Sequence, residues 1–289
     1  YLVYPRLGGR KAIIARHCAI KLYLYKNYGE IVDRYRDAVD KGCDRLRGDV
    51  IWFCWLQGEE NMPEMVRCCY AAVRANACGR EVRLVTSNNY GNFVTVPDFI
   101  MKKLGQGKLS RTHFADYLRV LLLSQYGGLW IDATVLTTGK IEEDQRYSFY
   151  SVKMPPESIH YVSEYRWAVW LLGCSSEPGR RLFLCVEELF RAYIAEHDTF
   201  IDFFLFDYFI AMICDRLPQM RAIIDDVPMN NTGCYKLFHC MNDAYTDERW
   251  KEITDGTVFH KCSWKQDCSR LTASGQRTYY DYLINKHKH

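Results

Sequence analysis

The chain has 289 residues and a net charge of +3, and 48% of its residues are hydrophobic. This length suits one large domain with a sizeable core, and so mild a charge gives no reason to expect a nucleic-acid partner. No segment reaches the roughly 18 uninterrupted apolar residues that span a bilayer. Thirteen cysteines without regular spacing argue against a disulfide framework and predict reduced thiols in a cytoplasmic protein.

Residues 1–48 are predicted to form helices that precede the main domain. Residues 10–47 have a helical pattern, which we expect to break near residues 27–29. The first 26 residues contain basic side chains and no acidic one. Such a helix either makes peripheral contact with the anionic cytoplasmic face of the inner membrane, or packs on the domain with its basic side in solvent.

Residues 49–140 have the pattern of a nucleotide-binding α/β half. Short apolar runs alternate with amphipathic helices, and ligands of such folds bind beyond the carboxyl ends of the strands. Thr112 is the expected N-cap of the helix predicted at 112–126. Strands are predicted at 49–56, 81–86 and 129–132, and helices at 62–76, 96–104 and 112–126.

Residues 141–289 are less regular and are expected to complete the same domain, because no repeat or low-complexity linker separates them from the preceding half. Strands are predicted at 149–152 and 168–172, helices at 179–196 and 202–214, and a functional loop around 257–265.

The most informative feature is a carboxylate at the end of the apolar strand that follows Gly127 and Gly128. A lone Asp132 at that position is costly unless a cation or hydroxyl meets it. Asp116 and Arg119 lie three apart on the preceding helix and so share one face. The glycine pair allows a tight reversal and a close approach to a ligand. Together these residues suit a polyhydroxylated ligand that carries phosphate.

The segment HFADYLRVLLLSQYGGLWIDATV resembles the donor-binding signature of retaining sugar transferases, in particular the bacterial capsular polysaccharide synthesis protein family. It is more distantly similar to the mannosyltransferases of outer-chain initiation and to the glucosyltransferase domain of clostridial toxins. Those families carry Asp-x-x-Arg, Gly-Gly and Asp-x-Asp. Here Asp116, Arg119, Gly127, Gly128 and Asp132 match, and Thr134 stands in place of the second acid.

The resemblance implies an α/β protein with the GT-A type nucleotide-diphospho-sugar transferase fold: a mixed central sheet flanked by helices, here with added N-terminal helices. It further implies retaining transfer of a hexose from a nucleotide sugar, a UDP-sugar in the first instance. The acceptor would be a glycan or lipid-linked glycan of a capsular polysaccharide or lipopolysaccharide, and residues 141–289 would form the acceptor half and the C-terminal loop that closes the site.

The resemblance also assigns donor contacts. Trp55 would stack on the base and Asn88 would read the base edge, while Asp116, Arg119 and Gly128 would contact the sugar and phosphates. Each residue type also has an ordinary structural use. An indole can fill the core, an asparagine can form a turn, and Asp and Arg three apart can form a plain helical ion pair.

The related enzymes hold a divalent cation, Mn²⁺ or Mg²⁺, between Asp-x-Asp and the diphosphate. By this resemblance Asp132 is the main metal ligand and a catalytic residue, with Thr134 and His260 as further ligands. With Thr134 in the second position, either Asp132 holds the metal through water or Thr134 supplies a weak neutral oxygen. Lys261 and Lys265 are expected to face the β-phosphate, where negative charge builds up as the leaving group departs.

Asp207 lies inside an otherwise apolar run, so its carboxylate must be paired or functional. The resemblance places it beside the anomeric carbon as a second catalytic residue, and a structural helix cap is the alternative. Two other functions remain open for the chain. One is a non-catalytic module that binds a sugar nucleotide or glycan on the same scaffold, and the other is a membrane-docked scaffold that uses the basic N-terminal helix.

Overall fold

The computed structural model describes residues 9–36, 49–156 and 160–287. The predicted helical residues 37–47 and the basic Arg6 lie outside these ranges. Helices run over α1 Arg10–Asp33, α2 Glu64–Ala75, α3 Asp98–Gly105, α4 Arg111–Tyr126, α5 Glu177–Glu196, α6 Leu205–Arg216, α7 Pro218–Asp225, α8 Lys236–Cys240, α9 Asp247–Thr254 and α10 Tyr279–Lys286. Strands run over β1 Val50–Cys54, β2 Glu81–Val85, β3 Gly128–Asp132, β4 Val135–Thr137, β5 Phe149–Ser151, β6 Leu171–Cys174 and β7 Phe259–Lys261.

Within the described residues, a five-stranded sheet has the order β2-β1-β3-β6-β5. Strands β2, β1 and β3 are parallel, whereas β6 is antiparallel to β3 and β5 is antiparallel to β6. A separate antiparallel ribbon joins β4 to β7, so it brings the C-terminal part of the chain beside the end of β3. Every residue of β1 is buried, as expected for a parallel strand with both faces covered.

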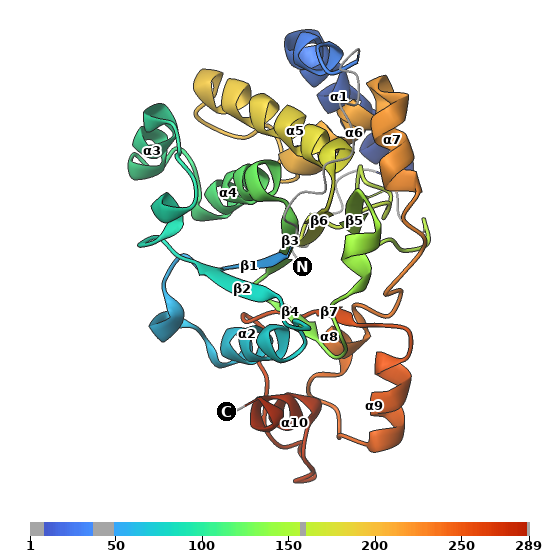
Figure 1. Cartoon of the computed structure of the whole chain (residues 1–289). Coiled ribbons are helices and arrows are strands. Elements are labelled where there is room, and N and C mark those ends of the chain that lie inside the picture. The colour runs from blue at the N-terminus through green and yellow to red at the C-terminus, as the bar shows by residue number, and fades with distance from the viewer. Residues whose placement is uncertain (1–8, 37–48, 157–159, 288–289) are drawn as a thin grey trace.

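Helices cover both faces of the sheet (Figure 1). Helix α4 lies over one face with α5 packed behind it, and α2 lies on the other side together with the β4–β7 ribbon and α10. The core between these layers contains large buried rings, including Trp52, Trp130 and Phe53. The arrangement confirms the predicted α/β class with a mixed sheet flanked by helices, and it is consistent with the GT-A type.

The turn between α4 and β3 explains why two glycines are adjacent there. Gly127 ends α4 with a φ of 68°, and Gly128 begins β3 with a φ of 90°. A Cβ atom on Gly128 would lie 2.3 Å from the carbonyl oxygen of Val50, so any side chain would push β1 and β3 apart. The predicted stop of the helix at this glycine pair is confirmed.

Two local predictions were wrong. Helix α1 does not break at residues 27–29; Gly29 leaves room for the Arg216 guanidinium, which pairs with Asp33 further along the same helix. The N-cap of α4 is Ser110, whose hydroxyl accepts from the backbone N–H of His113, and Thr112 lies inside the first turn. Serine two residues earlier offers the same capping chemistry, which the sequence pattern alone does not distinguish.

The N-terminal helix packs on the domain. Helix α1 contacts α5 and α6, Arg16 pairs with Asp202, and the Nζ of Lys21 lies 2.6 Å from Asp215. The helix packs on the domain as one alternative predicted, but part of its basic side pairs with acidic residues of the domain and does not face solvent alone. Within the described residues, none of the helices combines the length and hydropathy of a membrane span.

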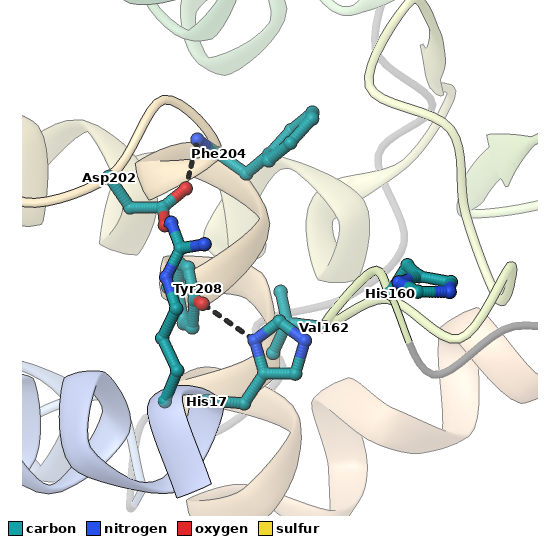
Figure 2. A pocket seen from close by; sticks show the side chains of 7 residues that line it. His17, His160, Val162, Asp202, Phe204 and Tyr208 are labelled. Atoms are coloured by element: carbon teal, nitrogen blue, oxygen red, sulfur yellow. Dashed lines mark hydrogen bonds and ion pairs between the residues drawn. The ribbon is translucent and has the colours of Figure 1, made fainter. Parts of the chain in front are cut away.

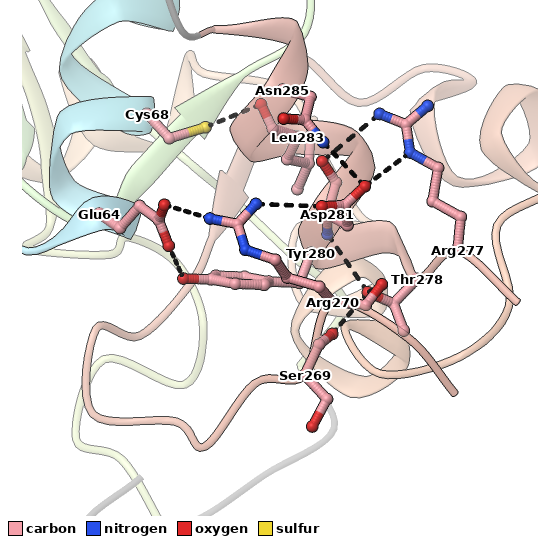
Figure 3. A network of polar contacts seen from close by, with 10 residues as sticks. All are labelled: Glu64, Cys68, Ser269, Arg270, Arg277, Thr278, Tyr280, Asp281, Leu283 and Asn285. Carbon is pink, nitrogen blue, oxygen red and sulfur yellow. Dashed lines mark hydrogen bonds and ion pairs between the residues drawn. The ribbon is translucent and has the colours of Figure 1, made fainter. Parts of the chain in front are cut away.

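A network of polar contacts fastens α10 to α2 (Figure 3). Arg270 pairs with Glu64 of α2 and, at 3.0 Å, with Asp281 of α10, while Tyr280 donates to Glu64 at 2.7 Å. Arg277 also binds Asp281, at 2.9 Å. We call these five residues the C-terminal clasp. Its arginine side chains are 42% and 46% exposed, so it lies at the surface.

Candidate active site

Three parallel strands end at one edge of the sheet. Cys54 of β1 pairs with Val85 of β2 on one side and with Asp132 of β3 on the other. The loops that follow are tied together, because the Trp55 N–H donates to the Val85 carbonyl at 2.9 Å and Ser87 donates to Leu56 at 3.0 Å. The predicted residues Trp55, Asn88 and Asp132 therefore share the carboxyl edge, where ligands of open α/β sheets bind.

Asp132 is held by donors on both carboxylate oxygens. Oδ1 accepts from Arg119 Nη2 and from Trp130 Nε1, each at 2.9 Å, and Oδ2 accepts from Lys261 Nζ at 2.9 Å. Burial alone would raise the pKa of Asp132, but Lys261 and Arg119 outweigh it and hold the pKa below its ordinary value. The side chain is 27% exposed. Asp132 is therefore a fixed, ionised carboxylate that still reaches the surface of the site.

Arg119 is buried behind Asp132 and does not face solvent. Its guanidinium also lies 3.2 Å from Asp116, donates to the carbonyl of Val169, and stands over the ring of Trp130 at 4.8 Å. Only 4% of the residue is exposed. The predicted contact of Arg119 with donor oxygens is therefore not what the structure shows: Arg119 positions two carboxylates.

Asp116 and Asp207 complete the same group of charges. Burial raises the pKa of Asp116 to about 6, although Arg119 pulls it back. Burial also raises the pKa of Asp207 to about 7, opposed by the hydrogen bond from Trp167 Nε1 at 2.9 Å and reinforced by the charge of Asp116. Asp207 lies in the first turn of α6 and is 7% exposed. It joins the site from a helix far along the chain.

Lys261 extends from β7 toward the end of β3. Its ammonium donates to Asp132 Oδ2 at 2.9 Å and to Thr134 Oγ1 at 3.0 Å, and it lies 5.7 Å from the ring centre of Trp170. The lysine side chain is 23% exposed. We call Asp116, Arg119, Asp132, Asp207 and Lys261 the strand-end cluster.

The structure does not bring His260 to Asp132. Side chains alternate along a strand, so the imidazole lies on the face of β7 opposite Lys261. Its Nε2 lies 3.2 Å from the Thr257 carbonyl and 3.1 Å from Thr138 Oγ1, and the residue is fully buried. Burial lowers the pKa of His260 to about 4, so the ring is neutral at pH 7. The prediction of His260 as a ligand beside Asp132 is corrected because its ring contacts Thr257 and Thr138 and not Asp132.

Gly128 also lies away from the cluster. It begins β3 whereas Asp132 ends it, which separates them by roughly 13 Å at the usual rise of a strand. The backbone of Val50 lies so close that only a glycine fits at position 128. The predicted contact of Gly128 with the donor is therefore replaced by a packing role.

The loop after β7 contacts Trp55, the residue that was predicted to stack on the base. Trp264, which is 43% exposed, meets Trp55 edge to face at a ring distance of 5.9 Å. Trp55 also donates from Nε1 to the Asn61 carbonyl at 3.3 Å. Lys265 has its Nζ 5.4 Å from the Trp264 ring, and Asn88 is exposed in the loop after β2. These residues border the site on the side of the opening strand.

A divalent cation is implied by the resemblance, and the donor set beside Asp132 does not fit one. Both Asp132 oxygens already bind N–H donors, and Thr134 accepts from the ammonium of Lys261. In the ranges that the structure describes, no three residues among His, Cys, Asp and Glu are grouped so as to hold a metal ion. An ammonium lies between the positions that the two acids of Asp-x-Asp would take.

Three tryptophans of the site were not found from the sequence. Trp130 lies two residues before Asp132 on the same strand, so the two side chains share a face, and this spacing was an available signal. Trp167 and Trp170 reach Asp207 and Lys261 from the segment before β6, where only the fold brings them close. Their indoles add low-polarity surface to the cluster, and Trp130 and Trp167 donate N–H groups to Asp132 and Asp207.

A small cavity elsewhere does not compete as the substrate site. It lies between α1 and the start of α6, lined by residues that include Arg16, His17 and Asp202, and His17 is hydrogen-bonded to Tyr208 at 2.6 Å (Figure 2). Its volume of about 20 Å³ leaves room for about one water molecule. A sugar nucleotide needs far more space, so we place the candidate site at the strand-end cluster.

Two comparisons bear on this site. A family model described as capsular polysaccharide synthesis protein matches residues 8–283. The chain is also 26% identical over 171 residues to the O-glycosyltransferase PaGT of Phomopsis amygdali, a match that covers 52% of this chain and 37% of that protein. The chain thus spans little more than a third of the length of that curated relative.

Proposed function

The chain belongs to the capsular polysaccharide synthesis protein family, and on that premise we propose that it is a glycosyltransferase. The donor would be a nucleotide sugar, with UDP-sugars first, and the acceptor would be a hydroxyl of a glycan or lipid-linked glycan. The proposal draws support from the name of the similar O-glycosyltransferase. The observation that carries it is Asp132, ionised and accessible at the carboxyl edge of the parallel strands, with a lysine ammonium on one side and a tryptophan-lined loop on the other.

The geometry suits the leaving group of such a reaction. As the bond from the anomeric carbon to the β-phosphate oxygen breaks, its electrons pass to the diphosphate, and the Lys261 ammonium stabilises the added charge. Asp132 and Asp116 can accept hydrogen bonds from sugar hydroxyls. The acceptor oxygen then bonds to the anomeric carbon on the same face, and its proton passes to the departing diphosphate. Retention in this scheme comes from the resemblance, and the anomeric configuration of the product, read by NMR, tests it.

The experiment that tests the function begins with binding. Thermal stabilisation would be measured with UDP-glucose, UDP-galactose, UDP-N-acetylglucosamine and GDP-mannose, with and without Mn²⁺, because a ligand that binds only the native state raises the melting temperature. The nucleotide sugar that stabilises most is then tested for slow hydrolysis and for transfer. We expect Asp132→Ala to lower turnover by roughly 100- to 1,000-fold or more while the protein stays folded.

Two results would contradict the proposal. Near-normal turnover in Asp132→Ala would remove the strand-end cluster from the reaction. Tight nucleotide-sugar binding without any hydrolysis or transfer would instead favour the non-catalytic binding module, for which the neutral Thr134 is the motivating residue.

A further inference from the structure

The position of the Lys261 ammonium is the unexpected feature of this site. In an Asp-x-Asp pattern the residues at 132 and 134 face one cation. Here the same two positions face a nitrogen of the chain itself, 2.9 Å from Asp132 Oδ2 and 3.0 Å from Thr134 Oγ1. A primary ammonium has three N–H donors and no acceptor, so it satisfies both oxygens and keeps one donor.

We propose that the Lys261 ammonium takes the place of the divalent cation, so that this chain binds the diphosphate of its donor without metal. The inference rests on the proposed function and names how its site holds the nucleoside diphosphate. The third N–H of Lys261 would face the β-phosphate, and the 23% exposure of the side chain leaves a path to it.

The backbone around Lys261 fixes this position. Lys261 pairs with Val135 in the β4–β7 ribbon, its N–H donates to the Cys234 carbonyl at 2.8 Å, and the next N–H donates to the Thr134 carbonyl at 2.8 Å. The ribbon therefore ties the lysine directly to the residue that stands in the second Asp-x-Asp position. The ammonium is held by the fold, as a bound ion would be held by its ligands.

Charge explains why threonine stands at position 134. Asp132 already faces two cationic groups, Arg119 on Oδ1 and Lys261 on Oδ2. A divalent ion on the same oxygens would have to displace the lysine or lie against its positive charge. With the lysine in place, the oxygen at 134 needs only to accept one hydrogen bond, which a neutral hydroxyl does.

The test measures UDP and GDP binding by calorimetry in EDTA and again in Mn²⁺. We expect the wild-type Kd for the preferred nucleotide to agree within twofold between the two conditions. Lys261→Met keeps the apolar stem beside Trp170 and removes the charge, and we expect it to weaken binding at least tenfold in EDTA. Lys140→Ala removes an exposed lysine whose Nζ is 3.8 Å from Glu142, and it serves as the matched control with unchanged affinity.

A charge-exchange variant tests the inference through a gain of metal binding, and so does not depend on a loss of nucleotide binding. Thr134→Asp combined with Lys261→Ala restores the two acids and vacates the position of the ammonium. We expect this double variant to bind Mn²⁺ alone, wild type to show no such binding, and the variant to recover nucleotide binding only when Mn²⁺ is present. Melting temperatures of all variants, read with and without Mn²⁺, show whether each is folded.

The outcomes separate the inference from the function on which it rests. Wild-type binding that requires Mn²⁺, or a Lys261→Met protein that binds normally in EDTA, overturns the role of Lys261 and leaves the glycosyltransferase proposal standing. Failure of wild type to bind UDP or GDP in either condition overturns both. Metal-independent wild-type binding together with a metal-dependent double variant supports the inference.

Discussion

The strand-end cluster and the C-terminal clasp contain similar charged groups in opposite surroundings. In the clasp, Arg270 bridges Glu64 and Asp281 with 42% of its side chain exposed. In the cluster, Arg119 bridges Asp116 and Asp132 with 5% exposed. Both arginines link two carboxylates from separate elements. The difference between them is therefore burial and not connectivity.

Burial decides what each network can do. Exposed ion pairs contribute little because water and salt screen them, so the clasp serves to hold α10 in place on α2. A buried group of charges is weak evidence for stability, since apolar residues would pack as well or better. Perturbed acids such as Asp116, with a pKa of about 6, and Asp207, with a pKa of about 7, instead mark the cluster as a candidate functional site.

Removing the buried arginine gives the largest effect that this comparison predicts. Arg119→Met leaves Asp116 without its cation and takes one of two cations from Asp132. Because breaking a buried pair leaves an uncompensated charge, we expect unfolding to become easier by about 3–5 kcal/mol. Urea denaturation at pH 7 measures the change. A loss below about 1 kcal/mol would mean that the cluster is as well solvated as the clasp, within the range of exposed pairs.

The second prediction concerns pH, for which the two regions have opposite signs. The pKa of Asp207 is raised to about 7, so the stability it contributes is present below its unfolded value of about 3.9 and is lost as pH rises through 7. Asp207→Asn keeps an oxygen for Trp167 and removes the titration. We expect the melting temperatures of the variant and wild type to agree at pH 4, and that of the variant to be a few degrees higher at pH 8.

The clasp supplies the matched comparison for that pH test. Burial would raise the pKa of Asp281, but Arg270 and Arg277 lower it, so its contribution is present above the unfolded value and lost as pH falls. Asp281→Asn should therefore differ from wild type at pH 7 and converge with it near pH 3. Parallel pH profiles for the two asparagine variants would remove the distinction between the regions.

The third prediction tests the solvent side of the strand-end cluster. Trp55 is half-buried and meets Trp264 across the entrance loops. If its ring stacks on the donor base, Trp55→Leu should weaken nucleotide binding by about 5- to 150-fold, corresponding to about 1–3 kcal/mol per stacked base. Calorimetry with the preferred nucleotide measures it, and Trp55→Phe, which keeps a flat ring, should lose less. If both variants bind the nucleotide as tightly as wild type, Trp55 has a packing role only.

Much of the fold was predictable because its signals are local. A continuous apolar run predicted β1, amphipathic spacing predicted α2, and the glycine pair predicted the end of α4. The register and order of the strands follow from contacts between distant segments. No local pattern shows that β7 would pair with β4, and that pairing is what carries Lys261 to Asp132.

The candidate site was predictable in composition more than in geometry. Asp116, Arg119 and Asp132 converge as predicted, because helix and strand spacing placed them on converging ends, whereas the contact between Lys261 and Asp132 was not predicted. The direction of His260 was not foreseen, since a shift of one residue along a strand reverses the side chain. The donor contacts proposed for Asn88 and Lys265 stay predictions, and both residues border the site.

The smallest expected effect comes from the exposed arginine. Arg270→Met removes both bridges of the clasp, yet water can solvate Glu64 and Asp281 as soon as the guanidinium is gone. We expect the melting temperature to fall by no more than about 2 °C, and by less in 1 M salt, where the wild-type pairs are already screened. Nucleotide affinity should not change, because α10, which the clasp holds, lies on the side of α2 away from β1 and β2 (Figure 1). A loss as large as that of Arg119→Met would show that connectivity, and not burial, sets the importance of a charge network in this fold.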